Sequence, residues 1–443
     1  MRDTLLDSPP TTTLVRPDYS GKFRCIGPVC EDSCCAGWTV YFDQAAYEKY
    51  QGIAAGPLRA SIDVHVIRQP AGEDGVSRAQ FARVQMTPAN VCPFLNAEKL
   101  CQIQAEHGED FLSVTCATYP RIAHRIDGLE EKALSLSCPE AARLVLLTPH
   151  LLASNAEGGY RMTWNEPWWD EAGNDLPSMA TDSCDARQER AQTPLQRYFW
   201  PIREFVMYLL VHRDYALWQR LFLLGIFVRR LDALARGELA RGFVALRHDF
   251  SVAVDSGALR ASMEAIPADL PLQLDMVLRL AGLRLPRSHV GARFVETIEA
   301  FKKGIGNGPG ATIDWLIENY ARAYEQVYEP FFRARPHILE NLLINAVFRT
   351  LFPFGNKADK PEAMAEMARE FALLASQFAL IKGLLIGVAG CYGAGFCEDH
   401  VVQTVQSASK HFEHHPGFLD EAYALLVASK LDNARGLTML VRN

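Results

Sequence analysis

The chain has 443 residues, of which 49% are hydrophobic, and its formal net charge at neutral pH is −7. A chain of this size can bury a large apolar core in two or three domains, and its composition excludes a largely disordered protein. The acidic balance argues against a nucleic-acid-binding protein, which needs a clustered basic face. The N-terminal stretch contains no apolar signal-peptide core, so we expect a cytoplasmic protein.

Up to about residue 150 the sequence predicts both short strands and short helices. Two segments rich in β-branched and aromatic residues, 38–42 and 81–86, predict short strands. A short helix capped by Asp43 lies between them. The later predicted elements are a strand over 100–104, a helix over 109–118, a hairpin over 121–137 that turns at residues 127–128, and a helix that begins at Cys138-Pro139.

Residues 152 to about 192 are rich in Gly, Asn, Asp, Ser and Pro, which predicts a long loop or linker. Beyond it, apolar residues recur at helical spacing without a fixed-period repeat, as in a helical bundle. The clearest stripes cover residues 199–210, 218–234, 295–301, 313–332 and 338–351. We therefore predict a mainly α protein, in which a mixed α+β cysteine-rich N-terminal domain (15–150) and a linker (151–192) precede an all-helical domain (193–443).

One apolar segment, residues 371–397, is long enough to cross a bilayer. Lys382, polar residues and glycines interrupt it, and no aromatic belt flanks it. Because an uncompensated lysine is rare within a span, we predict a buried core helix and no membrane span. Two glycine-rich runs, 304–310 and 390–395, lack the strand–turn–helix context of a phosphate site. We expect a flexible loop at the first and a closely packed helix end at the second.

Cysteines are the most informative residues of the chain. Eight of the eleven lie in the first 140 residues, namely Cys25, Cys30, Cys34, Cys35, Cys92, Cys101, Cys116 and Cys138. In a reducing compartment such a density predicts a metal site rather than disulfides. The adjacent Cys34-Cys35 pair suits a mononuclear zinc site poorly, whereas an iron–sulfur cluster distributes its thiolate ligands over several irons. A zinc-stapled domain, or simply buried thiols, is the alternative. The C-x3-C-x2-C radical motif is incomplete, since position 37 is glycine.

A second polar cluster lies near the end of the chain, where His411, Glu413, His414 and His415 precede Pro416. Nothing else with metal-ligand spacing lies nearby in the sequence. We therefore expect a solvated helix end there rather than a metal site. No sequence motif identifies a catalytic nucleophile or base, because catalytic groups often meet only in space.

Several motifs connect the cysteines with neighbouring residues. They are Phe23-x-Cys25-x4-Cys30-x3-Cys34-Cys35-x2-Trp38, Cys92-Pro-Phe-Leu95 with Leu100-Cys101-x-Ile103, Gly108-Glu109-x2-Leu112-Ser113-x2-Cys116-x2-Tyr119-Pro120-Arg121, Leu136-Ser137-Cys138-Pro139-Glu140-Ala141-Ala142-Arg143, and Glu340-Asn341-x3-Asn345-x2-Phe348-x3-Phe352-Pro353-Phe354. Together they resemble the flagellin lysine-N-methylase family, within a wider group of cysteine-rich proteins that chelate iron or zinc. The resemblance covers both halves of the chain.

The resemblance implies an enzyme that methylates the ε-amine of flagellin lysines, with S-adenosylmethionine as donor and an iron–sulfur cluster of the four-iron type at or near the site. Carried over to this chain, the cluster ligands come from the eight cysteines of the first 140 residues. One four-iron cluster needs four thiolates at most. Either half of these cysteines are structural, or the domain holds more metal than one cluster.

The methyl-transfer chemistry sets its own requirements. A lysine amine attacks only when neutral, and its ordinary pKa of ~10.4 keeps it protonated at neutral pH, so the site must lower that pKa or supply a base. We expect Trp38 and Tyr119, with Tyr41 and Phe354 as further candidates, to hold the sulfonium of the donor by cation–π attraction. Ordinary core packing is the commoner role of each aromatic residue. Arg121 suits the donor's carboxylate.

Three functions remain open from the sequence. The first is the lysine methylase. The second is an iron–sulfur electron-transfer or iron-carrying protein whose helical part is a docking surface, and the third is a zinc-stapled scaffold without catalysis. Iron content separates the third from the others, and donor binding separates the first from the second.

Overall fold

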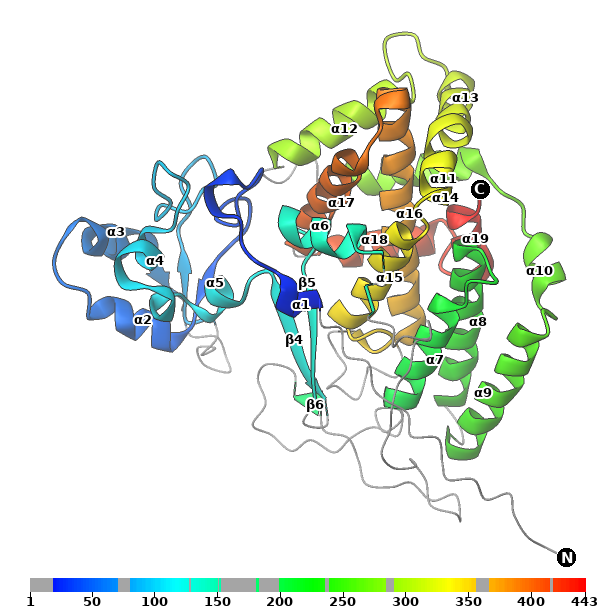
Figure 1. Ribbon diagram of the computed structural model, residues 1–443, viewed down its shortest axis with the longest axis horizontal. Helices are drawn as coiled ribbons and strands as arrows, with labels where there is room; N and C mark the ends of the chain where they lie inside the picture. Colours follow the sequence, from blue (N-terminus) through cyan, green and yellow to red (C-terminus); the bar gives the residue numbers. More distant parts are fainter. Residues whose placement is uncertain are drawn as a thin grey trace, which may run out of the picture.

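The computed structural model describes residues 19–70, 80–126, 129–149, 151–152, 181–182, 199–235, 239–283, 291–355, 366–414 and 417–443. Within these ranges the chain is mainly helical, as predicted. Figure 1 shows a cysteine-rich part (residues 24–118) beside a larger helical part (residues 199–443). A connecting segment (residues 119–149) lies between them. The predicted mixed α+β N-terminal region followed by an all-helical region is thus confirmed. Most of the predicted linker, 151–192, lies outside the described residues.

The N-terminal elements are short. In chain order they are α1 (Tyr19–Lys22), a 3-10 turn (Gly27–Val29), β1 (Tyr41–Phe42), α2 (Gln44–Gln51), α3 (Pro57–His65), β2 (Val66–Arg68), β3 (Ala82–Val84), α4 (Gln102–His107), a 3-10 turn (Glu109–Phe111) and α5 (Val114–Thr118). β3 pairs antiparallel with both β1 and β2, and Phe42 faces Ala82 across the first pair. The Asp43 side chain caps α2 as predicted, accepting a hydrogen bond from the backbone of Ala46.

The predicted strand over residues 100–104 is wrong. Cys101 precedes α4 as its N-cap, and only an isolated bridge joins Leu95 to Cys101. The Asn96 side chain accepts a hydrogen bond from the Leu100 backbone at 2.8 Å, which closes a tight turn just before the helix. The predicted helix over 109–118 is interrupted, because Ser113 turns extended and caps α5 through the backbone N–H of Cys116.

The connecting segment follows the prediction. Its hairpin pairs β4 (Arg121–Ile126) with β5 (Leu129–Leu134), with Ile126 opposite Leu129 in the register. The predicted turn residues 127–128 lie outside the described residues. A two-residue strand, β6 (Thr181–Asp182), pairs with the other edge of β4. After the hairpin, Cys138 is the N-cap of α6 (Pro139–Leu147), whose first residue is a proline.

The helical part contains α7 (Phe199–Val211), α8 (Leu217–Ala235), α9 (Leu239–Asp255), α10 (Arg260–Glu264), α11 (Leu270–Gly282), α12 (Ala292–Gly304), α13 (Ile313–Ala323), a π-helical turn (Tyr324–Tyr328), α14 (Glu329–Arg333), α15 (His337–Arg349), α16 (Met367–Tyr392), a 3-10 turn (Gly393–Gly395), α17 (Glu398–Glu413), α18 (Phe418–Ala428) and α19 (Ala434–Val441). α16 is the central helix and packs against α8, α11, α12, α13, α17, α18 and α19.

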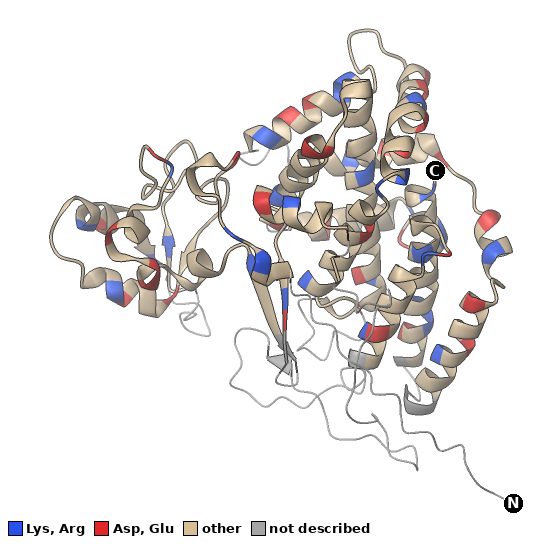
Figure 2. Ribbon diagram, in the orientation of Figure 1, with Lys and Arg blue, Asp and Glu red and all other residues tan. Residues whose placement is uncertain are grey.

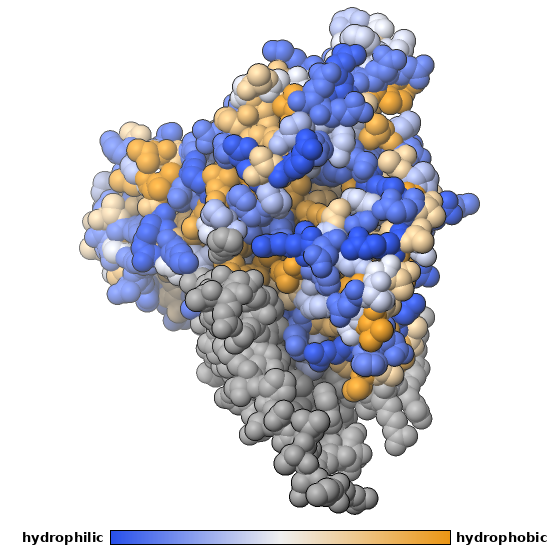
Figure 3. Space-filling view, turned by 45° about the vertical axis from the view of Figure 1, so that its right-hand side comes forward, coloured by the Kyte–Doolittle hydropathy of each residue, from blue (hydrophilic) through white to orange (hydrophobic). Residues whose placement is uncertain are grey.

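The apolar segment predicted to be a core helix is α16. Among the described residues it alone is long and apolar enough to cross a membrane, yet 94% of its most apolar stretch is buried inside the protein. The prediction of a buried core helix is confirmed. On the face drawn in Figure 3, hydrophilic residues alternate with small hydrophobic patches, as expected when the apolar helix faces are turned inward.

Two apolar clusters form the core. The smaller lies inside the cysteine-rich part, around Phe42, Tyr50 and Phe94. The larger combines the helical part with α1, β5 and α6. Asn345 fastens these pieces together, since its side chain accepts a hydrogen bond from Tyr19 at 2.8 Å and donates one to the Leu134 carbonyl at 2.9 Å. The connecting segment is therefore packed onto the helices, although it follows the cysteine-rich part in sequence.

Candidate functional site

A cavity of about 770 Å³ lies where the cysteine-rich part, the connecting segment and the helical part meet. Its walls come from α5 and β4 on one side, and from α15, α16, the end of α17 and the start of α18 on the other. Charges of both signs line it. Figure 2 shows that acidic and basic residues are also interspersed over the other described parts of the molecule.

The three residues predicted to bind a methyl donor all line this cavity, namely Trp38, Tyr119 and Arg121. The Trp38 indole donates a hydrogen bond to the Cys34 carbonyl at 2.7 Å, and its ring centroid lies 5.7 Å from that of Tyr119. Arg121 lies over the Phe23 ring and donates a hydrogen bond to the Phe23 carbonyl at 3.2 Å. The structure thus brings together side chains that are 83 positions apart in sequence.

The other two aromatic candidates do not line the cavity. Phe354 is buried in the helical core, where it stacks on Phe199 at 5.3 Å between ring centroids. Tyr41 lies in β1, within the sheet of the cysteine-rich part. Core packing is therefore the role of Phe354.

The end of α17 contributes residues that the sequence did not identify as functional. The expectation of a solvated helix end there is wrong. Only 11% of the Glu413 side chain is exposed, and His411 is buried against Phe294 with ring centroids 4.4 Å apart. His414 stacks on Trp38 at 4.8 Å. The helix end is covered because the loop carrying Trp38 and the residues before α6 fold over it. His415 lies outside the described residues.

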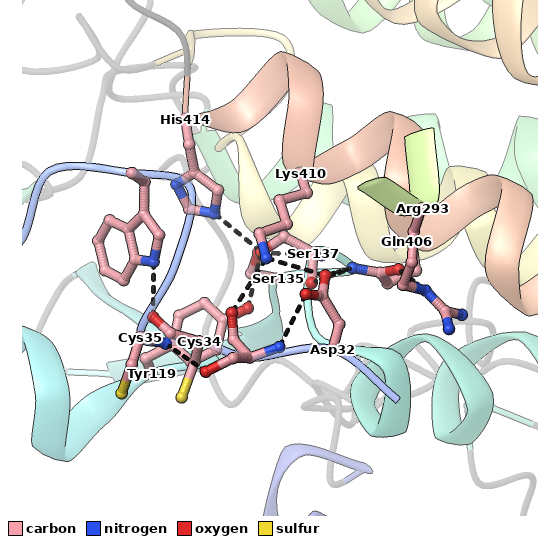
Figure 4. A network of polar contacts seen from close by, with 12 residues as sticks. Asp32, Cys34, Cys35, Tyr119, Ser135, Ser137, Arg293, Gln406, Lys410 and His414 are labelled. Atoms are coloured by element: carbon pink, nitrogen blue, oxygen red, sulfur yellow. Dashed lines mark hydrogen bonds and ion pairs between the residues drawn. The ribbon is translucent and has the colours of Figure 1, made fainter. Parts of the chain in front are cut away.

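Glu413 and His414 end a continuous hydrogen-bonded chain, of which Figure 4 shows Ser135, Ser137, Tyr119 and His414. Ser135 donates to the Glu413 carboxylate, and the hydroxyl oxygens of Ser135 and Ser137 lie 2.5 Å apart. The Ser137 hydroxyl also meets the Tyr119 hydroxyl at 3.0 Å and Nε2 of His414 at 2.9 Å. Burial raises the pKa of Tyr119 well above its ordinary value, so this phenol is neutral.

Arginines and carboxylates face one another across the helical wall. Arg349 on α15 lies 3.6 Å from Glu413. Arg369 on α16 pairs with Asp420 on α18 at 2.5 Å and lies 3.7 Å from Glu370. Burial lowers the pKa of His124, whose Nε2 is hydrogen bonded to the Arg349 carbonyl at 2.9 Å. The cavity thus presents both cationic and anionic groups to a ligand.

Helix α17 also holds the loop that carries Cys34 and Cys35. Gln406, Lys410 and His414 follow one another at four-residue spacing, and so lie on one face of the helix. Lys410 pairs with Asp32 at 2.8 Å and donates to the Ser33 carbonyl at 3.0 Å. Gln406 donates to Asp32 and to the Ser137 carbonyl, each at 2.8 Å. Figure 4 shows this clamp from α17 onto the cysteine loop.

Four of the predicted metal ligands belong to the apolar cluster of the cysteine-rich part: Cys35, Cys92, Cys101 and Cys116. The Cys92 backbone donates to the Cys35 carbonyl at 2.7 Å, which ties the two loops together. Burial raises the pKa of Cys92 to about 12 and that of Cys116 to about 11, and the neighbouring thiols, including Cys101, contribute to both shifts.

The other four predicted ligands lie on or around the loop that carries Cys34 and Cys35. They are Cys25, Cys30, Cys34 and Cys138. Cys25 and Cys30 precede this loop, and Cys138 lies at the N-terminus of α6. Burial raises the pKa of Cys138 to about 12, with contributions from Cys30 and Cys34. A hydrogen bond with Cys35 lowers the pKa of Cys34 to about 7. The Cys34-Cys35 pair therefore interacts electrostatically both with Cys138 and with the thiols of the apolar cluster.

Among the described residues, no three His, Cys, Asp or Glu side chains gather in a way that would hold one metal ion. The ligands of a four-iron cluster bind different irons, so they need not converge on a single point. The donors here are thiols alone, free of disulfides, and they oppose one another's ionisation until a cation is present. This donor chemistry fits a thiolate-bound iron cluster.

Comparisons with known proteins agree with the resemblance in the motifs. A family model for the FliB lysine N-methylase C-terminal domain matches residues 203–440. The lysine-N-methylase of Salmonella typhimurium is 21% identical over 406 residues, which cover 91% of this chain and 92% of that protein. The lysine-N-methylase of Salmonella choleraesuis matches with the same identity and coverage. The flagellar biosynthetic protein FliU of Salmonella muenchen is 28% identical over 142 residues, 32% of this chain and 81% of that protein. No solved structure matches the chain.

Proposed function

The chain belongs to the FliB lysine N-methylase family and is a protein-lysine N-methyltransferase, and on this basis we propose that it methylates flagellin lysines with S-adenosylmethionine as donor. The observation that carries the proposal is the cavity between the cysteine-rich part and the helices, which gathers Trp38, Tyr119 and Arg121. One relative is a flagellar biosynthetic protein, which supports a flagellar substrate.

The charged groups of the donor are complementary to side chains on the cavity wall. S-adenosylmethionine carries a sulfonium and, on its amino-acid end, a carboxylate. The faces of Trp38 and Tyr119 are suited to the sulfonium, since aromatic rings attract cations that have lost their water. Arg121 and Arg349, both on the wall, are suited to the carboxylate through the guanidinium fork.

The lysine to be methylated approaches as an ammonium ion. Glu413, Glu370 and Asp420 on the helical wall would attract it, since opposite charges attract more strongly where water is partly excluded. The reaction itself needs the neutral amine, whose lone pair displaces the thioether from the methyl group. The proton must therefore leave within the cavity.

We also propose that the cysteine-rich part binds an iron–sulfur cluster of the four-iron type. Cys35, Cys92, Cys101 and Cys116 would hold it, because they share one apolar cluster and α5, which carries Cys116, lines the cavity. When bound, such a cluster supplies electron transfer or a Lewis-acidic iron. Zinc is the alternative metal. Free thiols in the described residues support a reducing, cytoplasmic location.

Donor binding tests the cavity directly. We predict that Arg121→Lys weakens the affinity for S-adenosylhomocysteine by about tenfold, because lysine cannot offer a bidentate fork to the carboxylate. Isothermal titration calorimetry measures this affinity without requiring turnover. Arg83→Lys is the matched control, since Arg83 is exposed on β3 and should leave binding unchanged. An Arg121→Lys variant that binds as tightly as the wild type would remove Arg121 from the donor site.

A further inference from the structure

Two charged residues of the cavity wall, Arg349 and Glu413, form an ion pair where two helices end. Arg349 is the last residue of α15, and Glu413 is the last residue of α17. Nε of Arg349 lies 3.6 Å from Oε1 of Glu413, and only 17% and 11% of the two side chains are exposed. An N–H···O hydrogen bond is shorter, at about 2.7–3.2 Å. A better-placed charge on a ligand can therefore replace either partner.

The place of Glu413 in its helix favours a cation nearby. The C-terminus of a helix carries a partial negative charge, because its last carbonyl groups have no partner within the helix. A carboxylate at this end is locally unfavourable, whereas an ammonium ion is attracted by both the helix end and the carboxylate. The Ser135 hydroxyl donates to Oε2 of Glu413, and Oε1 is the oxygen in contact with Arg349.

Much of the surroundings of the Arg349–Glu413 pair is apolar. A recess of about 30 Å³ shares both residues with the cavity, and its other walls include Leu342, Phe378 and Ile381. Where little water is present, a charge that loses its partner is costly. A ligand that takes one member of the pair therefore binds best when a second ligand compensates the other member.

We propose that the two ligands of the reaction exchange partners with this pair. Glu413 binds the ε-ammonium of the substrate lysine, Arg349 binds the carboxylate of the donor, and the exchange couples the two binding events. This inference rests on the proposed methyl transfer. Either ligand alone separates one member of the pair from its partner, whereas both together leave every charge paired. Each ligand therefore raises the affinity for the other by the same factor.

The other carboxylates of this wall are arranged differently, since three of them lie around Arg369. They are Asp420 at 2.5 Å, Glu366 at 3.5 Å and Glu370 at 3.7 Å. The Asp420 side chain is 78% exposed, so water and salt screen its charge. When a ligand takes one of these carboxylates, Arg369 keeps the other two. The Arg369 group therefore does not link the two ligands as the Arg349–Glu413 pair does.

Calorimetric titration of S-adenosylhomocysteine into the full-length, iron-loaded protein tests the exchange, with and without saturating unmodified flagellin. We expect flagellin to raise the affinity of the wild type for S-adenosylhomocysteine by about fivefold or more. Glu413→Gln without flagellin should bind as tightly as the wild type with flagellin, because Arg349 is already released. Flagellin should then add nothing. The glutamine keeps the shape of the side chain and can still accept a hydrogen bond from Ser135.

Arg349→Gln should show the reverse pattern. Its affinity for S-adenosylhomocysteine should fall, while flagellin alone should bind more tightly than it binds the wild type, because Glu413 is released. Glu318→Gln, at an exposed position of α13, is the control and should behave as the wild type in both titrations. A substitution that only disturbs the cavity would weaken both ligands. Tighter binding of one ligand thus distinguishes partner exchange from a structural defect.

Two results would overturn the inference and leave the proposed methyl transfer in place. The first is a wild-type affinity for S-adenosylhomocysteine that is the same with and without flagellin. The second is a Glu413→Gln variant that binds S-adenosylhomocysteine no more tightly than the wild type does. A wild-type protein with intact iron that does not bind S-adenosylhomocysteine at all would instead contradict the proposed donor, and the inference with it.

Discussion

Lys382 is buried in the middle of the central helix. Its ammonium donates a hydrogen bond to the Val441 carbonyl at 2.6 Å and another to the Asn443 side chain, and it lies 5.9 Å from the centre of the Tyr324 ring. Burial lowers the pKa of this lysine to about 7. The lysine thus fastens the last helix to α16, while its charge opposes folding at neutral pH.

This burial predicts a pH-dependent effect of Lys382→Met. Between about pH 7 and pH 10.4 the unfolded chain binds one more proton than the folded one, so wild-type stability rises with pH. At and below pH 7 the cost of burial is fully present. Relative to the wild type, the Met variant should therefore gain roughly 1–3 kcal/mol on moving from about pH 9.5 to about pH 7.

Thermal unfolding of both proteins at the two pH values measures this shift. The exposed Lys303 on α12 provides the control, since Lys303→Met should show no such pH dependence. A stability difference between Lys382→Met and wild type that is the same at both pH values would contradict a depressed pKa.

The cysteines lead to a second prediction at this scale. Cys92→Ser or Cys116→Ser in the anaerobically purified protein should remove most of the bound iron and the broad visible absorption of thiolate-to-iron charge transfer, because each loses a ligand. Cys391→Ser is the control, since Cys391 lies at the end of α16, outside the cysteine-rich part. Iron analysis and an absorption spectrum suffice. Equal iron in all variants would exclude Cys92 and Cys116 as ligands.

At the scale of elements, the close approach of α12 to α16 depends on glycine. A Cβ atom on Gly304 would lie 1.7 Å from the Gly387 carbonyl oxygen, so the two helices would have to separate. We predict that Gly304→Ala lowers the free energy of unfolding by ~3 kcal/mol or more. Chemical denaturation measures the loss. Gly291→Ala meets nothing within 4 Å and should change stability little; an equal effect of both would refute the packing argument.

Capping and turn residues in the sequence correctly predicted the helices and strands next to them. The Asp43 cap, the pairing of strands 121–126 and 129–134 and the helix after Cys138-Pro139 all form, because such signals act on their immediate neighbours in the chain. Residues 100–104 did not form a strand, since a tight turn stabilised by Asn96 places Cys101 at a helix start. A short apolar run does not reveal such a turn.

The end of α17 shows why part of the site was not predictable. A Glu-His pair before a proline is typical of an exposed helix end. Here Trp38 and Ser137 cover it, and these residues lie more than 270 positions away in sequence. Trp38, Tyr119 and Arg121 were identifiable because they neighbour cysteines in recognisable motifs, whereas Glu413 and His414 carry no comparable local signal.

At the scale of the whole molecule, the site lies between the parts of the chain rather than inside one of them. The cysteine-rich part supplies Trp38, the connecting segment Tyr119 and Arg121, and the helices Arg349 and Glu413. The clamp from Lys410 to Asp32 holds these parts in contact. The predicted domain limits at residues 150 and 192 stay predictions, because the intervening segment is mostly outside the described residues.

Mass spectrometry of flagellin tests the central claim most directly. The iron-loaded protein is incubated with unmodified flagellin and S-adenosylmethionine, and the flagellin is then weighed intact and mapped after digestion. We predict mass increments of one methylene per methyl group added, confined to lysine-containing peptides and absent when the donor is omitted. Flagellin of unchanged mass, after incubation with a protein whose iron and visible absorption are intact, would contradict methyl transfer to flagellin.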